Sequence, residues 1–147
     1  TTEAIRRSVA VKAAVVSEDE REETGRRTIL NYGHTVGHAV EVATAYGRFR
    51  HGEADAIGMT AAAAISRRMG LLSPAEERRQ RELLERFGLP ASADDIDRAA
   101  IISAIALDKK VRAGAVRWVL LEGIGRAVVR DDVPRAVVEE ALDEVLS

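Results

Sequence analysis

Apolar residues recur along most of this chain at spacings of three and four, the pattern of helices with one buried face. The pattern predicts helices at about residues 2–16, 27–44, 53–69, 74–87, 97–109 and 134–145. Two alternating runs, 116–121 and 126–129, flank a glycine-containing turn and predict a hairpin. We therefore expect a mainly α fold, a multihelical domain with one small β-hairpin and no internal boundary.

Residues typical of helix ends support two of these elements. Gly70 stands where a glycine usually ends a helix. Ser73 is placed to cap the next helix, with Pro74 at the first position and Glu76 completing a capping box. In the helix at 97–109, the residues expected to supply the core are Ile101, Ile102, Ile105 and Leu107.

The segment 27–44 differs from an ordinary surface helix in the residues of its polar face. On one continuous helix, an arc of roughly 80° would hold Arg27, Asn31, His34, His38 and Glu41. The opposite side would hold the apolar set Ile29, Tyr32, Val36, Val40 and Ala43. A surface helix usually carries Lys and Glu on its polar face, so this face is typical of the wall of a site.

Two glycines, Gly33 and Gly37, lie four residues apart on the flank of this segment. Glycine lowers helix propensity, so its presence here needs a reason other than helix formation. We interpret both as positions where another backbone or a ligand approaches closely.

The three histidines of the chain all lie between positions 34 and 51. His34 and His38 would project from one helix face about one turn apart, and His51 would open the next helix after a break at 45–50. No cysteine and no dependable acidic ligand accompany them, which disfavours a closed four-ligand structural site. An open catalytic metal site, completed by a carboxylate and by water or substrate, fits better. The alternative from spacing alone is a set of core histidines without a metal.

Other charged residues allow two interpretations each. Lys12 lies on an apolar helix face, either extending its stem across the core edge or pointing into a site. The acidic segment before the histidines is a solvated loop, from which Glu22 could reach a site. Asp55 is either a first-turn acid favoured by the helix dipole or a group near the site. The sequence Asp108-Lys109-Lys110 either suits a helix end or binds phosphate.

Composition narrows the class of protein without specifying an activity. The 147 residues fit one domain whose core needs no cross-links. The absence of cysteine excludes disulfides, thiolate metal sites and a cysteine nucleophile, and suits a cytoplasmic location. A net charge of -2 and short apolar runs favour neither nucleic acid nor a membrane as partner. The chain lacks a signal-peptide pattern and an initiator Met, so we expect it to begin inside a larger protein.

Specific motifs carry a resemblance to a known enzyme family. The sequences LNYGHTVGHAVE and HGEADAIGM, with DERE and Lys12 before them and DKK and VLLEGIG after them, resemble the C-terminal half of 3-dehydroquinate synthase. The order is the same over nearly the whole chain, and the two His motifs are specific to the sugar-phosphate cyclase superfamily. The resemblance implies conversion of 3-deoxy-D-arabino-heptulosonate 7-phosphate to 3-dehydroquinate and phosphate, the second step of the shikimate pathway.

The resemblance also implies a division of labour between two domains. Residues 1–147 would be a helical domain that binds metal and substrate, beside a Rossmann-like N-terminal domain that binds NAD. His34 and His51 would be ligands of a divalent metal, usually zinc or cobalt. His38 would face the substrate and its phosphate and help to relay protons. The full-length protein would be a homodimer, as members of this family usually are.

Substrate contacts follow from the same resemblance. Residues that would bind substrate hydroxyls, carboxylate or phosphate, and so take part in catalysis, are Lys12, Arg27 and Asn31, with Glu22 nearby. One lysine of the 108–110 motif would also contact the substrate. We favour Lys110, and Lys109 stays open as the alternative.

The chain departs from the family pattern in two respects. The family's third metal ligand, a glutamate, and its glycine-rich NAD segment lie upstream of these motifs, so this chain contains neither. We therefore expect the chain to be inactive alone. In addition, Asp55 stands where the family usually has an apolar residue, which changes the expected packing beside His51.

Two alternative functions stay open. The first is a related cyclase that makes a different carbocycle, such as a 2-deoxy-scyllo-inosose or valiolone synthase, with the same metal chemistry. Asn31 and the intact GHTVGHA sequence favour dehydroquinate synthase. The second is a non-catalytic helical module that binds a metal or a partner.

Overall fold

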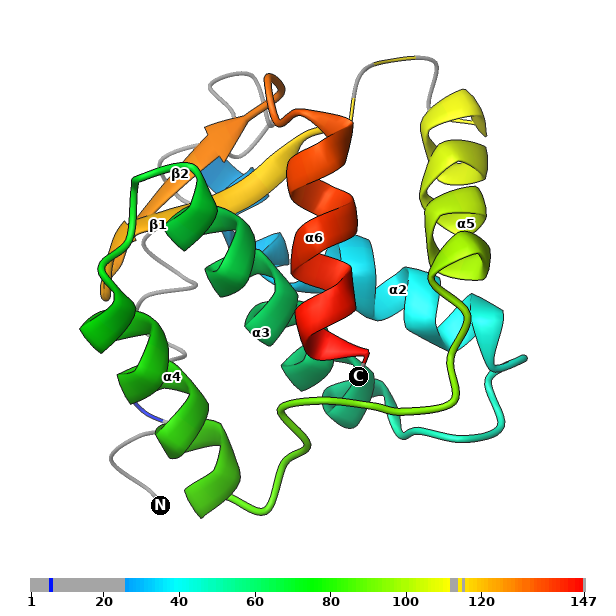
Figure 1. Ribbon diagram of the computed structural model, residues 1–147, viewed down its shortest axis with the longest axis horizontal. Coiled ribbons are helices and arrows are strands. Elements are labelled where there is room, and N and C mark those ends of the chain that lie inside the picture. The colour runs from blue at the N-terminus through cyan, green and yellow to red at the C-terminus, as the bar shows by residue number, and fades with distance from the viewer. Residues whose placement is uncertain (1–5, 7–25, 112–113, 115, 147) are drawn as a thin grey trace.

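A computed structural model describes residues 6, 26–111, 114 and 116–146 of the chain. Its elements in order are η1 (Arg26–Asn31), α2 (His34–Ala43), α3 (His51–Arg68), α4 (Pro74–Arg86), α5 (Arg98–Val111), β1 (Trp118–Gly123), β2 (Arg126–Arg130) and α6 (Arg135–Val145). The two strands pair antiparallel (Figure 1), so the predicted mainly α fold with one small hairpin is confirmed. Apart from Arg6, the helix predicted at 2–16 and the loop at 17–25 lie outside the described residues.

The segment predicted as one helix at 27–44 is in fact two helices. η1 is a 3-10 helix, and Gly33 adopts a φ of 83° before α2 begins. Because only glycine takes up this left-handed conformation at little cost, Gly33 ends one helix and sets the direction of the next. The predicted single polar arc is therefore wrong for Arg27 and Asn31, which precede the break.

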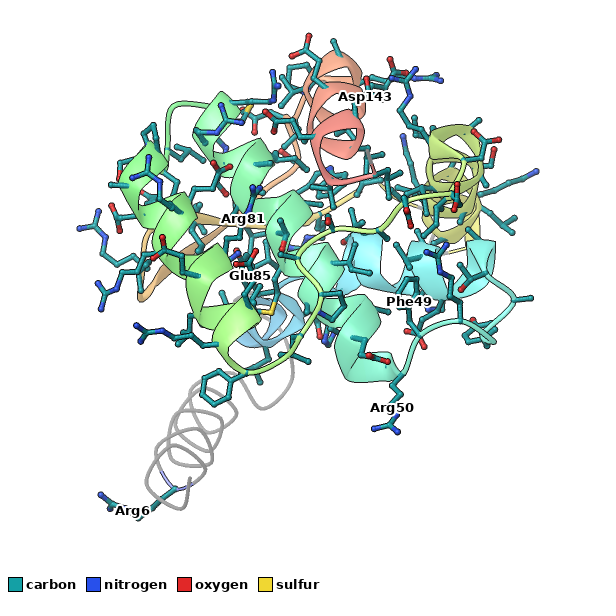
Figure 2. All side chains as sticks on the ribbon, turned by 60° about the horizontal axis from the view of Figure 1, so that its bottom comes forward. Arg6, Phe49, Arg50, Arg81, Glu85 and Asp143 are labelled. Carbon is teal, nitrogen blue, oxygen red and sulfur yellow. The ribbon has the colours of Figure 1, made fainter. Side chains whose placement is uncertain are left out.

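Most other helix ends follow the sequence signals. The N-cap Ser73 accepts a hydrogen bond from the backbone N–H of Glu76 at 3.2 Å. Gly70 has a φ of 74°, as expected after a helix. α3 begins two residues earlier than predicted, and the backbone N–H of Arg50 donates to Glu53 Oε1 at 2.8 Å. Figure 2 shows Arg50 projecting from the start of α3, away from the rest of the domain.

α3 is the central element of the fold, and it packs against α2, α4, α6 and β1. Figure 1 shows α6 alongside α3, with α2 reaching from α3 towards α5. The buried Ser66 joins α3 to the hairpin, because its hydroxyl donates to Ala62 O at 2.7 Å and accepts from Leu121 N–H at 3.0 Å. None of the described helices is long and apolar enough to cross a bilayer.

The predicted core assignment holds for most apolar positions but not for Leu107. On α2, Val36 and Val40 are buried and Ala43 packs against the core, as does Tyr32 in the turn before the helix. On α5, Ile101 is buried, whereas Leu107 is 61% exposed. The helical spacing predicted an apolar stripe on α5 that includes Leu107. The other described elements cover only part of this stripe and leave Leu107 exposed.

Three glycines allow α2 and α3 to touch along their backbones. A Cβ atom on Gly58 would overlap the carbonyl oxygen of Gly33 and lie 2.6 Å from the nitrogen of Gly37. A Cβ atom on Gly37 would lie 3.1 Å from the carbonyl oxygen of Ala54. The interpretation of Gly33 and Gly37 as points of close backbone approach is therefore confirmed.

This contact predicts opposite effects for two glycine substitutions in α3. Gly58→Ala should destabilise the domain by about 3 kcal/mol or more, because the backbones of α2 and α3 must separate to admit the methyl group. Gly52→Ala is the matched control, since nothing lies within 4 Å of its Cβ position. It should leave stability unchanged or raise it by up to about 1 kcal/mol through helix propensity. Thermal unfolding followed by circular dichroism measures both; equal melting temperatures for the two variants would contradict the predicted contact.

Candidate metal centre

A cleft of about 700 Å³ opens between the N-terminal end of α2, α3, α5 and the residues flanking the hairpin. Among the residues that line it are Asn31, His34, Thr35, His38, His51, Asp55, Asp108, Lys109, Arg117 and Asp131. All three histidines thus face one cleft, together with cations and carboxylates. The segments that supply them lie far apart along the chain, from η1 to the end of β2.

Two histidines and one carboxylate meet at the crossing of α2 and α3. The rings of His34 and His51 lie 6.0 Å apart between centroids. Asp55 Oδ2 lies 3.1 Å from His51 Nε2 and 3.5 Å from His34 Nε2. Within the described part of the chain, one ligand atom from each of these three residues lies within 4.8 Å of the other two. The close backbone approach of the two helices brings these side chains together.

A second carboxylate orients the ring of His51. Glu41 on α2 lies with Oε1 2.9 Å from His51 Nδ1. An ionised carboxylate can only accept, so Nδ1–H donates and Nε2 is directed towards Asp55. The hydrogen bond to Glu41, followed by the charge of Asp55, raises the pKa of His51 above its ordinary value. This arrangement is typical of a metal-binding histidine whose other nitrogen is held by a carboxylate.

A hydrogen-bonded tyrosine anchors the segment that leads into this cluster. The hydroxyl of Tyr32 donates to Gln80 Oε1 at 2.6 Å, and Gln80 Nε2 donates to Met59 O at 3.0 Å. Burial is the main cause that raises the pKa of Tyr32 above its ordinary value. Tyr32 therefore fixes the turn before His34 against α3 and α4.

The structure brings together four of the predicted site residues: Asn31, His34, His38 and His51. His38 is exposed at the cleft, with its ring 6.4 Å from that of Tyr46 between centroids. These placements agree with the predicted roles without testing them.

The structure does not place the other predicted substrate-binding residues among those described at the cleft. Lys109 lines the cleft, whereas Lys110 is exposed and is not among the lining residues described. Arg27 lies on η1, and the structure describes only its backbone. Lys12 and Glu22 lie outside the described residues, so their predicted roles stay predictions.

Sequence reasoning left the roles of two carboxylates undefined. The sequence places Glu41 on the polar face of the histidine segment but indicates no role for it. For Asp55 it allows two interpretations, a first-turn acid or a group near the site. A signal for Asp55 was present, since His51 and Asp55 are four apart and share one face of α3. Its proximity to His34 depends on how two helices cross, which spacing within one helix does not reveal.

The donor set fits a divalent transition metal. Two neutral imidazoles and a carboxylate are common ligands of catalytic zinc, which leave a position open for water or substrate. In addition, Asp55 Oδ1 is buried without a hydrogen-bond partner among the described residues. A carboxylate held in this way requires positive charge nearby, which a bound cation would supply.

The fold is similar to parts of solved sugar-phosphate cyclases. A 2-epi-5-epi-valiolone synthase from Streptomyces hygroscopicus subsp. jinggangensis, with NAD+ and Zn2+ bound, matches 98% of this chain and 39% of its own at a TM-score of 0.85 and 29% identity. A 2-deoxy-scyllo-inosose synthase complexed with carbaglucose-6-phosphate, NAD+ and Co2+ matches 94% of this chain and 40% of its own at a TM-score of 0.77 and 30% identity.

Sequence similarity is higher to another enzyme of this class. Residues 1–111 match the family described as 3-dehydroquinate synthase C-terminal, and the chain belongs to that family. A 3-dehydroquinate synthase of Nitrosospira multiformis is 49% identical over 97% of this chain and 39% of that protein. One of Methylacidiphilum infernorum is 43% identical over 97% of this chain and 40% of that protein. The chain thus spans about two fifths of the length of these relatives.

The orientation of His51 predicts a measurable role for Glu41. In the intact protein that carries this chain, Glu41→Ala should weaken the binding of Zn2+ about 10- to 100-fold, because the imidazole loses the partner that directs Nε2. Glu41→Gln should weaken it less, since the amide oxygen still accepts from Nδ1–H. Titration calorimetry on metal-free protein measures both affinities. Glu85→Ala, at an exposed position of α4 (Figure 2), is the control and should bind as the wild type does.

Proposed function

We propose that this chain is the metal- and substrate-binding C-terminal domain of a 3-dehydroquinate synthase. Joined to a Rossmann-like N-terminal domain that binds NAD, it would convert 3-deoxy-D-arabino-heptulosonate 7-phosphate to 3-dehydroquinate and phosphate. The observation that carries the proposal is the meeting of His34 and His51 at a cleft that Asn31, His38 and Lys109 also line. The proposed location is the cytoplasm.

His34 and His51 would hold a divalent cation, zinc or cobalt, at the crossing of α2 and α3. When bound, such a cation polarises adjacent substrate hydroxyls, and NAD on the other domain supplies reversible oxidation. Glu41 keeps the Nε2 atom of His51 directed into the cleft through the hydrogen bond at Nδ1. Both imidazoles would bind as neutral groups, since a protonated Nε2 has no lone pair to donate.

The remaining polar residues of the cleft suit a substrate with a phosphate and a carboxylate. His38 is exposed one helical turn beyond His34, so it can exchange protons with a ligand in the cleft. Lys109, near the end of α5, and Arg117, just before β1, add positive charge to the lining of the cleft. These two cations and the imidazole of His38 offer partners for an anionic ligand, in a cleft that Asp55, Asp108 and Asp131 also line. Asn31 offers both a donor and an acceptor for hydroxyl groups.

The choice of dehydroquinate synthase over the related cyclases depends on the degree of similarity. The two 3-dehydroquinate synthases described above are 49 and 43% identical to this chain, whereas the solved valiolone and scyllo-inosose synthases are 29 to 32% identical. The metal and cofactor in those structures belong to those proteins. For this chain they support a metal- and NAD-dependent cyclase as the general chemistry.

An assay of phosphate release tests the proposal directly. The intact protein, supplied with NAD and Zn2+ or Co2+, should release phosphate from 3-deoxy-D-arabino-heptulosonate 7-phosphate, and His34→Ala and His51→Ala should abolish both metal binding and turnover. The 147-residue chain alone should show no turnover, because it lacks the domain proposed to bind NAD. Release of phosphate from another sugar phosphate, with none from the heptulosonate, would assign the protein to a related cyclase.

The two neighbouring lysines predict different kinetic effects. Lys109→Ala should raise KM for the sugar phosphate about 10- to 100-fold, because a charge-assisted hydrogen bond contributes about 1.5–3 kcal/mol. Lys110→Ala is its control in the same helical turn and should change KM less than about 3-fold. Steady-state kinetics on the intact protein measures both. A larger effect at Lys110 would contradict the choice of Lys109 as the substrate contact.

A further inference from the structure

The carboxylate of Asp55 lies between two imidazoles that the proposed function assigns to the metal. One oxygen, Oδ2, lies 3.1 Å from His51 Nε2 and 3.5 Å from His34 Nε2. The side chain is 18% exposed, and its other oxygen is buried. A surface acid that merely favours the helix dipole would point to solvent near the first turn of α3. Asp55 instead points into the cluster.

A positive charge is needed between Asp55 and His51. Glu41 holds the proton of the neutral imidazole on Nδ1, so the lone pair of Nε2 would face an oxygen of Asp55 at 3.1 Å. Two acceptors at this distance repel each other. Either a second proton on His51 or a metal ion shared by the two atoms removes the repulsion. The ion pairs described for Asp55 involve only the two histidines, and neither is a permanent cation.

Two of the three separations in this cluster match those of ligands around one ion. Bonds of about 2.0–2.2 Å from zinc to nitrogen or oxygen place the ligands of a tetrahedral site about 3.3–3.6 Å apart. The separations of Asp55 Oδ2 from His51 Nε2 and His34 Nε2, 3.1 and 3.5 Å, lie close to this range. Two histidines and one carboxylate are also a ligand set that zinc and cobalt accept with an open position.

The neighbouring backbone leaves room for this carboxylate. A Cβ atom on Gly37 would lie 2.7 Å from Asp55 Oδ1, so any larger residue at position 37 would displace the carboxylate. The glycine that permits the two helices to meet therefore also accommodates an acid at this crossing. The buried Oδ1 has no hydrogen-bond partner among the described residues, and the carboxylate faces the two imidazoles through Oδ2.

We propose that Asp55 is a direct ligand of the divalent metal, so that His34, His51 and Asp55 form a three-ligand centre within this chain. The inference rests on the proposed function for the presence of a metal, and goes beyond it in the source of the carboxylate. The motif resemblance implied an apolar residue at position 55 and a glutamate upstream. With Asp55 as ligand, this chain itself supplies a carboxylate to the centre.

Cobalt spectroscopy on the intact protein tests this assignment. Metal-free wild type is titrated with Co2+ while the visible d–d absorption, which reports the ligands of the ion, is recorded together with the affinity. Asp55→Asn and Asp55→Val should each shift the d–d bands and weaken binding at least about 100-fold, more than the loss of an outer partner causes. Asp55→Val needs no hydrogen-bond partner, so it tests the proposal even where Asp55→Asn fails to fold. Asp94→Asn, at an exposed ion pair with Arg48, should bind with unchanged bands and affinity.

Three outcomes separate this proposal from the proposed function. Shifted bands in the folded Asp55 variants, with wild-type bands in Asp94→Asn, establish Asp55 as a ligand. Unchanged bands in a folded Asp55 variant, with binding lost in His34→Ala, overturn the assignment of Asp55 and leave the histidine centre intact. A wild type that binds no Co2+ or Zn2+ overturns the proposed metal centre itself, and Asp55 then pairs with a protonated imidazole.

Discussion

The structure depends on the direct contact between the backbones of α2 and α3. Helices with ordinary side chains pack about 8–10 Å apart between their axes, a separation that would move the imidazoles of one helix away from those of the other. Here Gly33, Gly37 and Gly58 remove the side chains that would keep the helices apart. The buried surface of α3, the start of the histidine segment and the candidate centre all take their positions from this crossing. The close packing of α2 and α3 and the grouping of the candidate metal ligands therefore both depend on these three glycines.

The charges around the centre are arranged in layers. Glu41 contacts the outer nitrogen of His51, and Asp55 faces the inner nitrogens of both His51 and His34. The ring of His51 thus has a carboxylate on either side, and the ring of His34 faces Asp55. Because these groups come from two rigid helices, rather than from a loop, little conformational entropy is lost when the cleft is filled. The cations of the cleft lie on other elements, towards α5 and the hairpin.

The sequence predicted the elements well, and it predicted the site to the extent that the site follows local spacing or motif. Ser73, Gly70 and the alternation at the hairpin act over a few residues, so their effect can be read without the fold. The grouping of His34, His38 and His51 was predicted from their concentration and from the motif resemblance.

What the sequence did not predict depends on contacts between distant elements. A helical wheel assumes one continuous helix, so the break at Gly33 was missed. The stripe on α5 includes Leu107, but a stripe does not show how far the neighbouring elements extend to cover it. The position of Asp55 against His34 requires the crossing of α2 and α3. Lys12 and Glu22 lie outside the described residues, and their predicted roles stay predictions.

The candidate ligands lie close together along the chain, between residues 34 and 55. A helix, a short connection and the start of a second helix are enough to bring them together, so the chain entropy lost in closing this loop is small. Contacts of such low sequence separation form early when a chain folds. We therefore expect the α2–α3 pair to form before the hairpin and α6 have docked.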